Sequence, residues 1–108
     1  MNDPWRNEEP ISIYTLAQGI ADGLYVEIFK NRWKELSAGK PIVATTALCE
    51  AVSLAALREI WNAYVVWRRE VMPTLPVAEH LFATTMNEAA VWVIEDEQAY
   101  TLLFPEDY

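Results

Sequence analysis

The C-terminal third of the chain alternates between apolar and polar positions in three short stretches. These stretches are HLFATTM (residues 80–86), AVWVIE (90–95) and AYTLLF (99–104). Alternation with a period of two is typical of strands that bury one face. The residues between them, at 87–88 and 95–98, are short enough to form tight turns between antiparallel neighbours. The pattern therefore predicts an antiparallel meander of three strands.

The middle of the chain changes to a helical period. From Thr45 or Thr46 to Val71, apolar residues recur three and four positions apart, and Pro73 then stops the helix. An unbroken helix here would be about 37 Å long at roughly 1.5 Å per residue. Ser53 is the position at which we expect that it could kink or divide in two.

One broad face of this helix is apolar and is the expected core stripe. It comprises Leu48, Cys49, Val52, Ala56, Ile60, Ala63, Tyr64, Trp67 and Val71. A second set, Leu54, Leu57, Trp61 and Val65, widens the apolar arc well beyond that stripe. A helix this apolar is covered on more than one side. We expect the second cover to come either from the N-terminal segments or from another protein.

Shorter elements precede the long helix. Prolines indicate an extended arm over residues 1–10, in which we expect Trp5 to dock on the body. IYTLAQGIADG (13–23) predicts a short helix that begins at Thr15 and ends at Gly23. The following elements are a strand LYVEIF (24–29), a helix NRWKELSAG (31–39) capped by Asn31 and ended by Gly39, and a strand KPIVAT (40–45).

These elements predict a single α+β domain over residues 1–108. One long helix packs on the C-terminal three-stranded antiparallel meander, and short N-terminal helices and strands complete the fold. A chain of 108 residues with 53% hydrophobic residues can bury a core without disulfides and is far too apolar for a disordered segment.

Charge is distributed unevenly around a net value of −8. Residues 1–27 carry −4, residues 28–72 carry +3 and residues 73–108 carry −7. Such a distribution is either ordinary solvated charge or suits selective docking on a partner, and the net negative charge disfavours nucleic acid or anionic lipid. The predicted meander places Glu88, Glu106 and Asp107 at one end of the sheet and Glu79, Glu95, Asp96 and Glu97 at the other. Acids split between two poles do not track a phosphate backbone, which argues against a DNA mimic.

Targeting signals and membrane spans are not expected. The acidic N-terminus lacks the apolar stretch of a signal peptide, and no run approaches the roughly 18 apolar residues that span a bilayer. We therefore expect a cytoplasmic protein with no membrane partner.

The sequence offers little catalytic or metal-binding chemistry. Cys49 and His80 are the only cysteine and histidine, and Cys49 falls on the core stripe, where a thiol is usually inert. Phosphate-loop, nucleophile-elbow and HExxH motifs are absent, and EDEQ (95–98) lacks the spacing of a calcium loop. We expect no catalytic residue, no metal and no cofactor. FKNRWKELSAGK (29–40) gathers four cations around Trp33 and could grip nucleic acid, but we favour an inward Trp33 with solvated cations.

Two segments carry a resemblance to a known family. They are Y-T-x-A-Q-x-I-x-D-G from Tyr14 to Gly23 and Y-T-L-x-x-P-E-D from Tyr100 to Asp107, with GKPIVAT and the Trp-bearing helix between them. The chain resembles a family of small acidic proteins of unknown function from bacteria, plasmids and phages. The resemblance implies a compact domain with a role in mobile elements, and it transfers no site residue.

Two hypotheses about function follow. The first is a non-enzymatic protein-interaction module of phage or plasmid type, for example an inhibitor of a host defence nucleoprotein. Its predicted contact residues are Leu54, Trp61 and Val65 on the helix flank and Glu95, Asp96 and Glu97 at one acidic pole, and the helix flank could instead join two copies in a homodimer. The second is a small-molecule-binding or enzymatic domain. Its aromatic pocket between helix and sheet would be lined by Tyr64, Trp67, Trp92 and Tyr100.

Overall fold

Five strands form one mixed sheet with helices against it, in a computed structural model that describes residues 16–108. The predicted arm over residues 1–10, Trp5 and the Thr15 cap lie outside the described residues. The strands are β1 (Tyr25–Glu27), β2 (Ile42–Thr45), β3 (Phe82–Met86), β4 (Ala89–Glu95) and β5 (Tyr100–Leu103). The α-helices are α1 (Leu16–Ala21), α2 (Trp33–Ser37), α3 (Thr46–Ala51) and α4 (Leu54–Glu70). Single 3-10 turns are η2 (Lys30–Arg32), η3 (Met72–Thr74), η4 (Val77–Glu79) and η5 (Pro105–Asp107).

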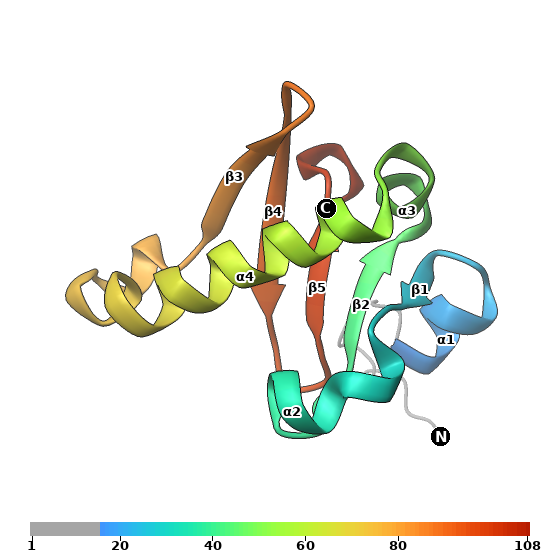
Figure 1. Cartoon of the computed structure of the whole chain (residues 1–108), viewed down its shortest axis with the longest axis horizontal. Helices are drawn as coiled ribbons and strands as arrows, with labels where there is room; N and C mark the ends of the chain where they lie inside the picture. The colour runs from blue at the N-terminus through green and yellow to red at the C-terminus, as the bar shows by residue number, and fades with distance from the viewer. Residues whose placement is uncertain (1–15) are drawn as a thin grey trace, which may run out of the picture.

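The sheet has the strand order β1-β2-β5-β4-β3 (Figure 1). The predicted meander is confirmed, because β4 pairs antiparallel with both β3 and β5. The tight turn at Asn87 and Glu88 is confirmed as well, and both residues have the positive φ that a two-residue hairpin turn requires. The earlier strands join the same sheet, with β1 antiparallel to β2 and β2 parallel to β5. This parallel pairing was not predicted, since the two strands are far apart in sequence.

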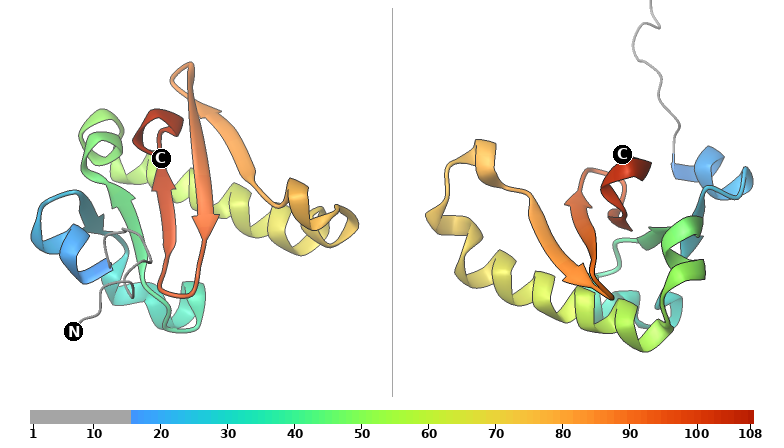
Figure 2. Two further views of the ribbon diagram at one scale, coloured as in Figure 1. Left: turned by 180° about the vertical axis from the view of Figure 1, so that it is seen from behind. Right: turned by 90° about the horizontal axis from the view of Figure 1, so that it is seen from above.

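α4 crosses one face of the sheet, as the views in Figures 1 and 2 show. The predicted α+β fold class is confirmed. The buried side chains of α4 are Leu57, Ile60, Trp61 and Tyr64, which recur at helical spacing. The predicted stripe was partly wrong, because Ala63 is exposed and Val71 is 42% exposed. Leu57 and Trp61, which the sequence placed on the flank, belong to the buried face of α4.

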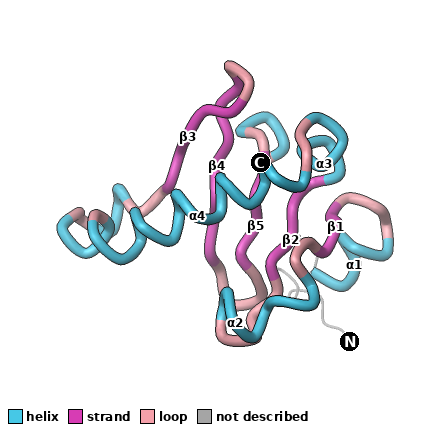
Figure 3. Tube along the Cα trace, viewed as in Figure 1, coloured by secondary structure: helices cyan, strands magenta, loops and turns pink. Residues whose placement is uncertain are grey.

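The long helical segment is divided at Ser53, the position that the sequence had marked (Figure 3). Val52 and Ser53 have extended backbone, so α3 ends and α4 starts in a new direction. The Ser53 side-chain oxygen accepts a hydrogen bond from the Ala56 N–H at 3.1 Å. Ser53 is therefore the N-cap of α4 and satisfies one of its free N–H groups.

The two segments that carry the family resemblance meet at the start of α3. Gly23 has a φ of +77° and ends α1, as predicted, while the Leu24 N–H donates to the Gly19 carbonyl at 2.8 Å. The Thr46 N–H then donates to the Leu24 carbonyl at 3.0 Å. From the other side, the Thr45 hydroxyl donates to Asp107 at 3.0 Å. Both segments thus have a structural role at one junction.

α2 departs from its prediction at the N-terminus. Asn31 lies inside η2 and is not a cap, and Arg32 precedes α2 without a side-chain cap. The chain can turn here because Phe29 adopts a left-handed conformation with a φ of 56°. The Trp33 indole N–H donates to the Ile28 carbonyl at 2.8 Å, so Trp33 is turned inward as favoured from the sequence.

Replacing Ser53 by Ala should destabilise the protein by about 1 kcal/mol, because the Ala56 N–H loses its acceptor at the start of α4. Urea unfolding followed by tryptophan fluorescence measures this change. Ser53→Asp is the matched control, since a carboxylate also caps helix N-termini and should leave stability near that of the original protein. Equal losses in both variants would contradict the capping role.

Candidate protein-interaction site

The three helix-flank residues predicted as contacts do not share one surface. Leu54 is 63% exposed at the first position of α4, whereas Trp61 is 2% exposed and Val65 is partly buried. The Trp61 ring packs against Tyr64 and Tyr100, with centroids 5.4 and 5.1 Å away. Trp61 is thus covered within the chain, and the interpretation that it lies on an uncovered flank was wrong. Leu54 is the one of the three that stands well exposed.

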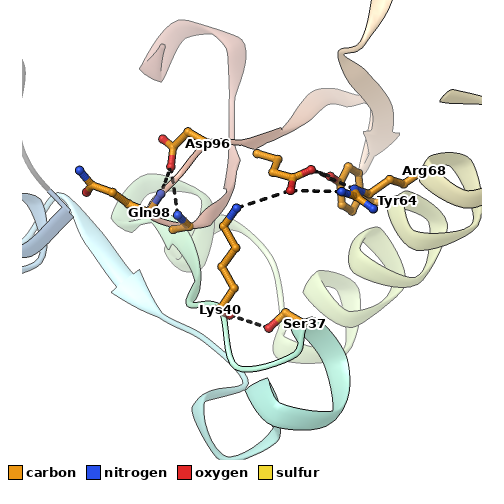
Figure 4. Close-up of polar contacts among 8 residues, drawn as sticks. Ser37, Lys40, Tyr64, Arg68, Asp96 and Gln98 are labelled. Carbon is orange, nitrogen blue, oxygen red and sulfur yellow. Dashed lines mark hydrogen bonds and ion pairs between the residues drawn. The ribbon is translucent and has the colours of Figure 1, made fainter. Parts of the chain in front are cut away.

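The three predicted acidic contacts also have different surroundings, and Figure 4 shows those of Asp96. Glu95 forms ion pairs with Arg68 and Lys40, so its charge is balanced within the chain. Asp96 accepts hydrogen bonds from the backbone N–H groups of Gln98 and Ala99 at 2.7 and 3.0 Å and holds the turn between β4 and β5. Glu97 is exposed. As predicted for the meander, the turn that holds all three lies at the end of the sheet opposite the β3–β4 turn.

Glu95 is the centre of a polar cluster that joins α4 to the sheet and to the loop before β2. Its two oxygens accept from the Arg68 Nε and a terminal Arg68 nitrogen at 2.9 and 3.2 Å. Lys40 Nζ lies 3.5 Å from the second oxygen and 4.8 Å from the centre of the Tyr100 ring. The Tyr64 hydroxyl lies 3.4 Å from the first oxygen. The arrangement is a bidentate pair supported by a second cation, a geometry that fixes orientation.

The pKa shifts of this cluster favour the ionised carboxylate of Glu95 and the charged guanidinium of Arg68, which are the forms that pair. Burial pushes the pKa of Glu95 upward, but the hydrogen bonds and charges of Arg68 and Lys40 outweigh it and hold that pKa below its usual range. The hydrogen bond from Arg68 to Glu95 raises the pKa of Arg68. Burial, followed by the Glu95 charge, raises the pKa values of Tyr64 and Tyr100. A carboxylate with a lowered pKa and two cationic partners is poorly suited to act as a general base near neutral pH.

The four aromatic residues of the alternative hypothesis do not line one pocket. Tyr64 and Tyr100 border a hollow of about 260 Å³ beside Arg68, while Tyr64 and Trp67 border a separate one of about 230 Å³. Tyr64, Trp67 and Tyr100 otherwise pack on one another or on Phe82. Trp92 lies on the face of the sheet away from α4, because it alternates along β4 with buried Val91 and Val93. The centre of its ring lies 5.9 Å from the centre of the Tyr108 ring.

Cys49 and His80 lie far apart in the fold. Cys49 belongs to α3, which follows β2, whereas His80 precedes β3 at the far edge of the sheet. Burial, and then the neighbouring Glu50 charge, raises the pKa of the Cys49 thiol, which disfavours the nucleophilic thiolate. Within residues 16–108, no three His, Cys, Asp or Glu side chains group closely enough to hold a metal ion. In that same part of the chain, no helix combines the length and apolar character needed to cross a membrane.

A larger hollow lies beside the start of α4 and was not predicted. Its volume is about 620 Å³. We call it the α4 groove, and its lining residues are Phe29, Lys30, Asn31, Arg32, Leu54, Ala55 and Arg58. The lining combines an apolar part with three cations and contains no acid. The basic segment was noted in the sequence, but its position beside Leu54 depends on the tertiary fold.

The cations of the α4 groove have neighbours of their own within the chain. Lys30 pairs with Glu27 at 3.1 Å, and Arg32 pairs with Glu35 three residues along. The Arg58 guanidinium lies 5.9 Å from the centre of the Phe29 ring and donates through Nε to Asn62 at 3.2 Å. Exposed pairs of this kind contribute roughly 0.2–1 kcal/mol, so a stronger anionic partner can exchange with them.

Replacing Glu95 by Gln should lower the unfolding free energy by about 0.5–1 kcal/mol near neutral pH, because an exposed bidentate pair is lost. The pKa of Glu95 is lowered in the folded protein, so its contribution is fully present above the ordinary glutamate pKa and is lost as the pH falls through the folded value. Urea unfolding at a series of pH values measures the difference, which should vanish in acid. Glu97→Gln, in the same turn, is the control, since Glu97 is exposed and makes no ion pair with another described residue, and it should leave stability near neutral pH unchanged.

Comparisons with family models, with curated proteins and with solved structures gave no match. The assignment of a role to this chain therefore depends on the geometry of the described residues.

Proposed function

We propose that this protein is a non-enzymatic interaction module that binds an acidic segment of another protein in the α4 groove. The observation that carries the proposal is Leu54, which is 63% exposed inside a hollow whose polar lining is cationic, in a chain of net charge −8. An apolar side chain of the partner would bury Leu54 and Phe29. Acidic side chains beside it would reach Lys30 and Arg58.

The non-enzymatic part of the proposal is supported by the state of the reactive groups. Glu95 is paired with two cations, and the Cys49 thiol has a raised pKa and no histidine beside it. The hollows next to Tyr64 measure about 230 and 260 Å³, below the usual 300–1,000 Å³ of small-molecule pockets. These features favour an interaction surface over the alternative aromatic pocket.

The choice of partner class is supported by charge and by the resemblance noted in the sequence. Overall negative charge disfavours a nucleic acid ligand, and Trp33 is turned inward, so its ring is not presented by the basic segment for stacking on a base. The resemblance to phage and plasmid proteins makes the protein subunits of bacterial defence nucleoproteins the first partners to test. In this proposal the protein acts in the cytoplasm, where such complexes operate.

Peptide display against the intact protein tests the binding mode before any partner is identified. We expect selected peptides to place Asp or Glu next to Leu or Phe, with affinities that fall as salt rises. Leu54→Glu should weaken the binding of the selected peptides at least tenfold, because it places a charge on the apolar part of the groove. Fluorescence polarisation with labelled peptides measures the change.

Val66→Glu is the matched control, since Val66 is also an exposed aliphatic residue of α4 but does not line the groove. It should leave peptide affinity unchanged. Equal losses in both variants, or selected peptides without acids, would contradict the proposal. A thermal shift with one nucleotide or metabolite, removed by Tyr64→Phe, would instead favour the aromatic pocket.

A further inference from the structure

The β3 strand is an open edge of the sheet without the usual protection against pairing. It is the last strand in the order, and within residues 16–108 β4 is the one strand that pairs with it (Figure 1). Its sequence FATTM contains no charge, no proline and no glycine. Natural edge strands are commonly kept from pairing by a lysine, a proline, a bulge or very short length. The register of β3 with β4 is continuous over five pairs, so no bulge interrupts it.

The register identifies the backbone groups that face outward. Met86 and Ala89 flank the two-residue turn and therefore form a hydrogen-bonded pair. Hydrogen bonding then alternates along the strand, so Ala83 and Thr85 direct their N–H and C=O groups away from β4. Among the described residues, no hydrogen bond is made to these outward groups. They form a template for one more strand.

The opposite edge of the sheet differs in each of these respects. β1 has only three residues and ends at Glu27, which is paired with Lys30. The chain then turns sharply at Phe29, whose φ is 56°. Short length, charge and a bend are devices that discourage pairing. The contrast makes β3 the edge that is suited to a partner strand.

We propose that β3 pairs antiparallel with β3 of a second copy about a two-fold axis at Thr84. Centred there, Ala83 of one copy lies opposite Thr85 of the other, so the outward groups of both strands bond to each other. This register places the two turns that hold Glu88 at opposite ends of the strand pair, whereas a parallel arrangement would set Glu88 against Glu88. The separation of like charges thus favours the antiparallel dimer, in which the two sheets become continuous.

Apolar surface next to β3 supports a protein partner at this edge. Leu81, directly before the strand, is 41% exposed, and Val77 in η4 is 83% exposed. In the proposed register, the β3–β4 turn of one copy lies opposite Leu81 of the other. Pairing would therefore cover part of this surface, which adds to the backbone hydrogen bonds. This inference is independent of the α4 groove, because the two surfaces share no residue.

Sedimentation equilibrium of the intact protein over a range of concentrations tests the dimer. Thr85→Pro removes an outward N–H and no bond to β4, and Ala83→Lys adds the charge that edge strands commonly carry. Each should raise the dimer dissociation constant at least tenfold. Ala90→Lys is the matched control, because Ala90 is exposed on β4 opposite Thr85 and away from the outer edge, and it should leave the constant unchanged.

Amide hydrogen exchange by NMR locates the interface without any substitution. In the dimer, the amides of Ala83 and Thr85 should exchange at least tenfold more slowly than in dilute monomer. A chain that stays monomeric at millimolar concentration would overturn the proposal, as would a dimer in which both amides exchange freely. Protection that arises only with a strand from another protein would also overturn it, since the occupant would not be a second copy.

Discussion

The packing of one face of α4 on the sheet is the interaction on which the rest of the fold depends. Leu57, Ile60, Trp61 and Tyr64 cover the side of the sheet formed by residues such as Val93 and Leu102, and these side chains belong to one core cluster. Each large aromatic buries about 150–250 Å², which at about 25 cal/mol per Å² is several kcal/mol. The same burial removes Trp61 from the outer surface and leaves Leu54, at the start of α4, exposed.

Polar groups position this helix where hydrophobic packing alone would leave its rotation and ends undefined. Ser53 begins α4, and Arg68 near its other end is held by Glu95 at the end of β4. Glu95 looks in the sequence like one of several solvated acids in a turn, yet it links α4, the sheet and Lys40. Its charge contributes to orientation inside the chain, and the proposed interaction surface does not include it.

The two surfaces considered for binding have different physical characters. The α4 groove combines exposed Leu54 with cations in a protein of net negative charge, so in our proposal it would select a partner by charge. The edge of β3 offers backbone groups with little charge, so in our proposal it would select a partner by strand geometry. A dimer through β3 would carry two α4 grooves and would bind a repeated or dimeric partner with increased avidity.

Local patterns in the sequence determined the elements of this protein, because each depends on neighbouring residues. Period-two alternation predicted the meander, Gly23 predicted the end of α1, and Ser53 predicted the break in the long helix. The sequence did not determine that β2 lies parallel to β5, that Glu95 meets Arg68, or that Leu54 lies beside Lys30. Each of those contacts joins residues from distant parts of the chain. Local patterns allow many long-range pairings. One of them is selected only when the whole chain packs around a single core.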